Sequence, residues 1–151
     1  MALRPKGDPI RVTERVSAGV IKIGDCVTLT ADGRVRVATA SEALLGMSNT
    51  YCSAADQPCN VFDHPDQHYL IPKSGGVAAA PTAQTEFNLN YNIVAGASVG
   101  QESAHTLDSA SGATTATLPL RAVDRGRVLT SALEVVVLIN NHVSKAGVAG
   151  I

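Results

Sequence analysis

The sequence predicts an all-β protein, built as a small β-barrel or β-sandwich. Three observations support this fold class. Several short runs alternate apolar and polar residues with a period of two, as half-buried strands do. Gly, Pro, Asp and Asn recur between these runs as turn signals, and no long run has helical periodicity. A chain of 151 residues fits one domain with a core that needs no disulfide staples.

The clearest local prediction is a β-hairpin. Val27 and Leu29 alternate with polar neighbours, and Val35 and Val37 do so in the next run, where arginines take the outward positions. The segment Ala-Asp-Gly that ends at Gly33 lies between the two runs. Because glycine adopts positive φ without steric cost, this segment suits a hairpin turn.

Further strands are predicted on either side of turn signals. The run Val135–Ile139 is continuously apolar, which is typical of a strand covered on both faces, although periodicity alone leaves a short helix open. Pro65 cannot donate to a sheet ladder and is placed in a turn between two strands. The remaining predictions are a bend at 41–47 before a strand, strands at 60–63 and 68–71, an extended segment with one buried face at 85–93, a loop at 96–117, and short strands at 118–123 and 127–130.

The two ends of the chain are predicted to lie outside a β-rich domain at 16–143. Residues 1–15 hold Pro5 and Pro9 and little to bury, which indicates an extended N-terminal arm, and 144–151 is a short C-terminal tail. Both segments carry too little hydrophobic surface to fold back on their own domain, so we expect them to lie along a partner, where the arm could add a strand. The expected partner-binding residues are Arg4, Pro5, Lys6, Pro9, Ile10, Val148 and Ile151.

Composition excludes some classes of partner. Lys+Arg 12 nearly balances Asp+Glu 13, which argues against a general attraction to nucleic acid or to an anionic membrane. No apolar run is long enough for a membrane span, and we expect no signal peptide at the N-terminus. The charged fraction is low and small residues are abundant, which fits a protein whose surface is covered by neighbours; an ordinary Ala-rich domain is the alternative.

The cysteines and the densest polar cluster were considered as chemical sites. Three cysteines are an odd number, so free thiols are expected, although Cys52 and Cys59 could pair. The cluster from Cys59 to His68 contains zinc-ligand types, but only His64 and His68 have a ligand-like spacing, and they straddle a proline. An exposed polar turn is therefore the preferred interpretation.

No pattern in the chain predicts catalysis. The sequence has no nucleophile elbow, no phosphate-binding loop and no carboxylate pair with a reason to share a cleft. Arg121, Arg125 and Arg127 form a basic group that fits a solvated face better than a partner's carboxylate. The prediction is a protein without enzymatic activity, with no catalytic, cofactor-binding or metal-binding residues.

Several segments together resemble a known family. These are GVIKIGDCVTLTADGRVRVA followed by LLGMSNT, then VFDHPDQHYLI, then TLPLRAVDRG followed by EVVVLINNHV, within about residues 16–143. They resemble capsid decoration (cement) proteins of tailed bacteriophages. The resemblance implies a β-rich structural protein on the outer surface of the virion capsid, made in the host cytoplasm. Its implied partners are the major capsid protein and further copies of itself, as a homotrimer or a dimer, without nucleic acid or membrane.

Three alternatives belong to other functions. The first is a minor structural protein of the phage tail or neck, which would have much the same sequence features. A small-molecule or glycan-binding β-barrel module would show a pocket lined by aromatic residues, and aromatic residues are rare in this chain. The third is a hydrolase or metal-dependent enzyme, which bound metal centred on His64 and His68 would favour.

Overall fold

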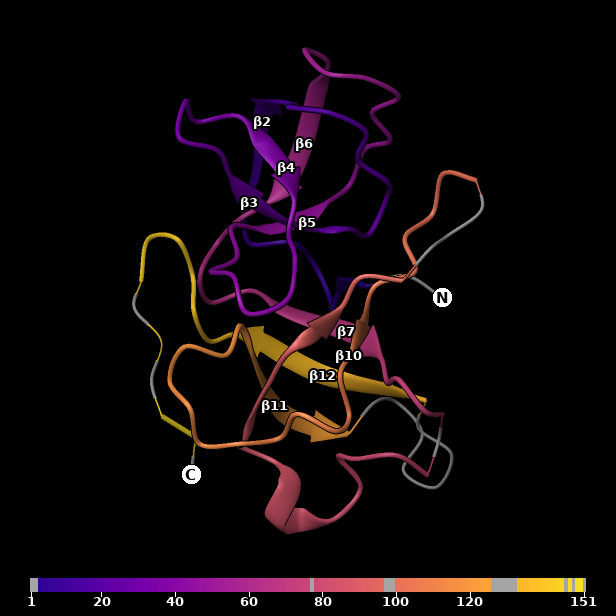
Figure 1. The fold of residues 1–151 in the computed structure, drawn as a ribbon, viewed down its shortest axis with the longest axis vertical. Helices are drawn as coiled ribbons and strands as arrows, with labels where there is room; N and C mark the ends of the chain where they lie inside the picture. The colour runs from indigo at the N-terminus through magenta and orange to yellow at the C-terminus, as the bar shows by residue number, and fades with distance from the viewer. Residues whose placement is uncertain are drawn as a thin grey trace.

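The prediction of an all-β fold is confirmed. The computed structural model describes residues 3–76, 78–96, 100–125, 133–145, 147 and 149–150. Over these ranges, two five-stranded antiparallel sheets lie one above the other along the long axis of the molecule (Figure 1). We call them the upper sheet and the lower sheet, after their places in that view.

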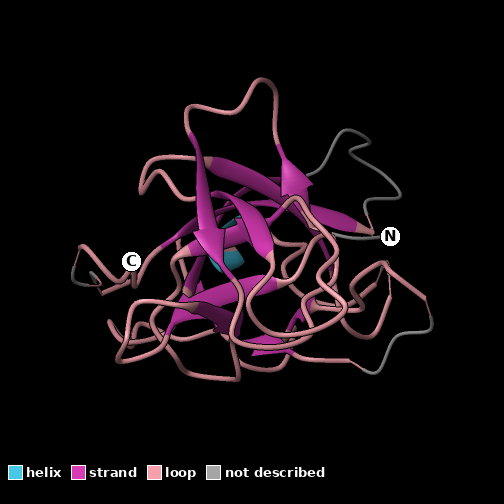
Figure 2. Ribbon diagram, turned by 90° about the horizontal axis from the view of Figure 1, so that it is seen from above, coloured by secondary structure: helices cyan, strands magenta, loops and turns pink. Residues whose placement is uncertain are grey.

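The strands of each sheet come from several parts of the chain. The upper sheet has the order β2-β6-β5-β3-β4 and the lower sheet the order β1-β7-β12-β11-β8, and β9 and β10 form a separate pair. In the view from above, the short helical segment is seen behind the strands, because it lies at the lower end of the molecule (Figure 1 and Figure 2). The upper strands are β2 (Val12–Val16), β3 (Cys26–Leu29), β4 (Val35–Val37), β5 (Gly46–Ser48) and β6 (Pro58–Phe62). The others are β1 (Arg4–Pro5), β7 (His68–Pro72), β8 (Asn90–Tyr91), β9 (Ile93–Val94), β10 (Thr106–Leu107), β11 (Leu120–Arg125) and β12 (Glu134–Ile139), with a 3-10 turn at Gln84–Glu86.

The predicted hairpin is present as β3 and β4. Val27 lies opposite Val37 and Leu29 opposite Val35 in an antiparallel register. Gly33 has φ +81°, the left-handed conformation that the turn requires. The hairpin could be found from sequence because every signal that defines it is local.

The central strands of the upper sheet are buried on both faces. Neighbouring residues point to opposite sides, so Cys26 and Leu44 enter one cluster while Val27 and Leu45 enter another. The larger cluster, here the main core, lies between the two sheets and includes Tyr69 of β7. The smaller one, here the inner cluster, consists of Ile21, Val27, Val35, Leu45, Cys52, Cys59 and Val61.

The upper sheet curls around the inner cluster. A parallel bridge between Ser17 and Val35 joins the end of β2 to β4, so the two edge strands meet there. The amide of Ala18 donates to the carbonyl of Val35 at 2.7 Å. Ile21 and Cys52, both members of the inner cluster, also exchange backbone hydrogen bonds. The upper sheet is therefore nearly closed, which leaves little free edge for another strand.

Residues 3–15 differ from the predicted arm. Arg4 and Pro5 pair with β7, and β2 pairs along its whole length with β6. Leu3 is only 3% exposed and belongs to the main core, and the Arg4 guanidinium binds the Glu134 carboxylate. The expectation that this segment cannot fold back is corrected, because one leucine, ion pairs and ladder hydrogen bonds hold it to its own chain.

The described part of the C-terminal tail also lies on its own chain. The amide of Gly150 donates to the carbonyl of Thr114, and Arg121 donates to the carbonyl of Ala149. A Cβ on Gly147 would lie 1.9 Å from the carbonyl oxygen of Ala116, so only glycine permits this approach. Hydrogen bonds and close backbone packing replace the hydrophobic surface that the tail lacks.

The other predicted strands are confirmed in part. The segment 134–143 contains β12, which is largely buried at the centre of the lower sheet. The segments around Pro65 are β6 and β7, which belong to different sheets. The segment 85–93 divides into the 3-10 turn and β8, and its Asn90 is fully buried instead of facing solvent. The segment 127–130 lies outside the described residues.

Candidate functional site

An exposed apolar strip runs along the outer part of β2 and β6. Ile10 is 55% exposed, Val12 50% and Val16 48%, which makes them three of the four most exposed large hydrophobic side chains described. Pro58, opposite Val16 in the register, is also exposed. These four residues are called the outer strip below.

The outer strip continues the face of the upper sheet that covers the main core. Phe62, opposite Val12, is buried in that core, whereas Asn60 and Pro58 on the same face of β6 are exposed. The strand β6 begins at the end of the upper sheet that is far from the lower sheet and runs toward the main core (Figure 1). The lower sheet thus covers one end of this apolar face and leaves the other end open to a partner.

A buried carboxylate fixes β2 beside β6. Asp63 is 1% exposed and accepts hydrogen bonds from Arg11 Nε at 2.7 Å, Thr13 Oγ1 at 3.0 Å and Arg15 Nη2 at 3.1 Å. Burial opposes ionisation of Asp63, but hydrogen bonds from the two arginines and the threonine outweigh it and lower the pKa of the carboxyl. The three donors share the face opposite to Val12 and Val16, so the network holds the outer strip outward.

The sequence-predicted partner residues occupy mixed positions. Lys6, Pro9 and Ile10 are exposed. Arg4 and Pro5 are half-buried in β1, where they pair with β7. Val148 and Ile151 lie outside the described residues. Of the expected set, Ile10 joins the outer strip, whereas Val12, Val16 and Pro58 were missed; alternation of valines in 10–16 was the signal that could have found the first two.

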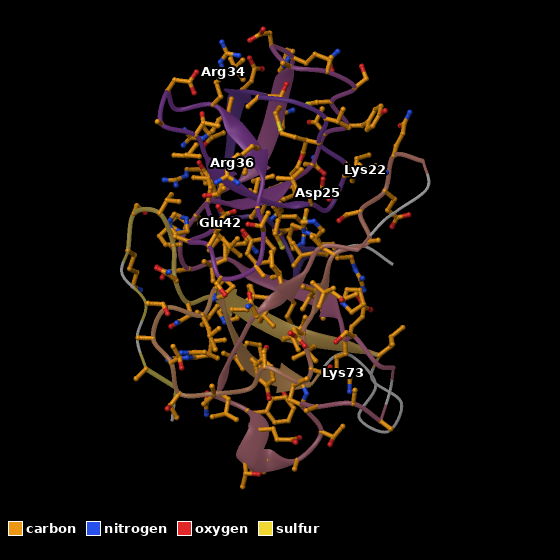
Figure 3. The ribbon with its side chains drawn as sticks, viewed as in Figure 1. Lys22, Asp25, Arg34, Arg36, Glu42 and Lys73 are labelled. Atoms are coloured by element: carbon orange, nitrogen blue, oxygen red, sulfur yellow. The ribbon has the colours of Figure 1, made fainter. Side chains whose placement is uncertain are left out.

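A second feature is a pocket between the β2–β3 segment and the β9–β10 loop. Its cavity volume is about 330 Å³, and it is lined by Val20, Lys22, Asp25, Val37, Ala95, Gly96 and His105. The loop is fixed there because Ile23 accepts from the amide of Ser103 and donates to the carbonyl of Gln101. Figure 3 shows Lys22 and Asp25 close together at the lower end of the upper sheet.

Two buried polar groups meet at this pocket. Asp25 Oδ1 and His105 Nε2 are 3.6 Å apart, and both side chains are more than nine-tenths buried. The amide of Cys26 donates to His105 Nδ1 at 3.0 Å, so in the neutral ring Nε2 carries the hydrogen. Asp25 Oδ2 accepts from the Lys22 amide at 2.8 Å. Burial lowers the pKa of His105 despite the nearby carboxylate.

The residues of zinc-ligand type do not converge. Cys59 is buried in the inner cluster with its Sγ 3.4 Å from Ser48 Oγ, and Asp63 binds arginines. His64 accepts a hydrogen bond from the Asp66 amide in the turn, and His68 is exposed in β7. Within the described ranges, no three His, Cys, Asp or Glu side chains are grouped to hold a metal ion.

The predicted basic group is only partly described. Arg121 donates to Asn90 Oδ1 and to the carbonyl of Ala149. The side chain of Arg125 and the whole of Arg127 lie outside the described part. None of the helical residues that the structure describes forms a helix capable of crossing a membrane.

Comparison with known proteins adds no relative. No protein-family model, no curated protein and no solved structure matches the chain. The functional argument therefore depends on the residues themselves.

Proposed function

We propose that this protein is a non-enzymatic structural component of a bacteriophage virion, which binds the outer surface of the assembled capsid and stabilises contacts between major capsid subunits. The single observation that carries the proposal is the outer strip, a set of exposed apolar side chains on a sheet face that the lower sheet leaves open and that also carries Glu14 and Asn60. The family resemblance of residues 16–143, the low charge and the many small residues support it.

The mechanism is mechanical. Each copy would bury the outer strip against a capsid subunit, and copies associated as a trimer or dimer would hold several subunits at once. Linked contacts bind much more tightly than each contact alone, because later contacts form at high effective concentration. The Asp63 network contributes by presenting the strip on a rigid strand, so little ordering entropy is lost on binding.

The test uses purified empty phage shells and full-length protein in co-sedimentation. We expect saturable binding at a fixed ratio to the major capsid subunit, lost in the double variant Val12→Glu/Val16→Lys. Substitution is a better probe than deletion of the N-terminus, because Leu3 is part of the main core.

The matched control is Val94→Lys, which places a charge on another exposed valine, in the separate β9–β10 pair. Its shell occupancy should equal that of the unmodified protein. Full occupancy by the Val12→Glu/Val16→Lys variant would refute the role of the strip, and failure of the unmodified protein to bind any shell would refute the proposed function.

A further inference from the structure

The pocket beside His105 shares no residue with the outer strip. We propose that it is a binding site for a small uncharged polyhydroxyl molecule about the size of a monosaccharide, with one hydroxyl group bridging Asp25 and His105. This inference goes beyond the proposed function and does not depend on it.

The bridging role follows from the geometry of the two buried groups. The separation of 3.6 Å between Asp25 Oδ1 and His105 Nε2 is too long for a strong hydrogen bond. A hydroxyl oxygen at the pocket wall can accept from Nε2–H and donate its own hydrogen to Oδ1. An ammonium group has no acceptor and a carboxylate has no donor, so neither satisfies both partners.

The charges around the pocket favour a neutral ligand. Asp25 and Lys22 both line the pocket, so the lining residues carry one negative and one positive formal charge. The ring of His105 stays neutral near pH 7, because burial lowers its pKa. No excess charge remains to select an ion, so hydrogen-bond pattern decides the ligand class.

Size and wall chemistry limit the ligand further. The volume of about 330 Å³ lies near the lower end of the range of roughly 300–1,000 Å³ for small-molecule pockets, too small for a nucleotide cofactor. Val20, Val37 and Ala95 provide an aliphatic wall for the C–H face of a sugar ring. Without an aromatic ring in the lining, we expect a dissociation constant on the order of 1 mM or weaker.

The experiment is a titration of the isotope-labelled full-length protein followed by NMR, using glucose and glycerol as probes and acetate and inorganic phosphate as contrasts. We expect glucose to shift the ring nitrogens of His105 and the methyl signals of Val37 saturably, with glycerol weaker. No saturable shift with glucose, or equal binding of acetate or phosphate, would overturn the proposal.

Two variants and a control sharpen the test through the Val37 methyl signals. His105→Asn keeps an acceptor for the Cys26 amide but removes Nε2–H, and glucose binding should weaken about tenfold. Val20→Arg, at an exposed rim position, should also weaken binding without threatening the fold. His68→Asn, on exposed β7 surface, should bind as the unmodified protein does. Unchanged binding in both His105→Asn and Val20→Arg would place the ligand elsewhere.

Discussion

The main core and the inner cluster are built from different side chains. Of the five Phe and Tyr residues in the chain, four lie in the main core: Phe62, Tyr69, Phe87 and Tyr91. The inner cluster contains aliphatic residues and two thiols and no aromatic side chain. Large side chains thus join the two sheets, whereas small ones fill the curl of a single sheet, where there is no room for a ring.

This difference explains how a chain poor in aromatics forms a two-layer fold. An aromatic side chain buries a large area, so four of them supply much of the contact between sheets. The inner cluster is filled by smaller side chains, most of them β-branched, together with Leu45 and two cysteines. Stability should therefore depend more on the main core than on the inner cluster.

The largest expected effect compares the same substitution in both clusters. Ile71 in the main core and Ile21 in the inner cluster are both fully buried. We expect Ile71→Ala to lower the free energy of unfolding by about 4 kcal/mol and Ile21→Ala by about 2 kcal/mol, within the range for such cavities. We expect this difference because the inner cluster has fewer and smaller buried side chains than the main core, so Ile21 packs against fewer large neighbours. Equal losses in urea unfolding would contradict the comparison.

A smaller effect is expected from the network that attaches β2. Asp63→Asn removes the charge that Arg11 and Arg15 bind. The free energy of unfolding should fall by about 2 kcal/mol, as when hydrogen bonds to a charged group are lost. Glu14→Gln, an exposed change on the same strand, serves as the control and should alter stability by less than about 0.5 kcal/mol. If the two variants were equally stable, the network would have no role in holding β2.

The smallest expected effect is a loss of stability at mildly acidic pH, through two buried histidines that connect different regions of the molecule. His105 links the β9–β10 loop to β3, and His142 Nε2 binds the carbonyl of Asp63. Burial lowers the pKa of both rings below the ordinary 6.5, with hydrogen bonds and charge as secondary influences. Below pH about 6.5 the two histidines bind protons more readily in the unfolded chain than in the folded protein. The free energy of unfolding therefore falls as the pH falls.

Urea midpoints measured from pH 7.5 to 5.5 check this, with His68→Asn as a control that keeps both buried rings. Carboxylates affect the free energy of unfolding in a separate, more acidic pH range. The hydrogen bond from Arg36 lowers the pKa of Glu42 to about 2, so its contribution is lost only below its ordinary 4.5. A midpoint that stays constant from pH 7.5 to 5.5 would show that neither histidine is held neutral.

The sequence predicted what local patterns determine. The hairpin of β3 and β4 and the strand β12 were found because alternation or a continuous apolar run identifies each strand by itself. The strands β1 and β2 were assigned to an arm because their partners, β7 and β6, lie more than forty residues away in the chain. Asn90 falls on the polar side of the alternation in 85–93, and nothing local shows that its amide donates to the Thr115 carbonyl and accepts from Arg121.

For the candidate sites too, residues with a local signal could be predicted from the sequence, and residues brought together only by the fold could not. Ile10 was identified as a contact residue because it is an apolar side chain among polar ones. Asp25 and His105 are eighty positions apart and look unremarkable individually, and only the β9–β10 loop brings them together.

The two-faced upper sheet constrains how this protein can change in length. Insertion of one residue at the start of β3 would turn Cys26 and Val27 to the opposite faces of the sheet, and these two side chains serve different clusters. Both interiors would then receive side chains of the wrong size. Natural variants should therefore gain or lose residues only in the loops, such as the exposed turn at 53–56. That turn is also where a foreign peptide could be displayed without disturbing either interior.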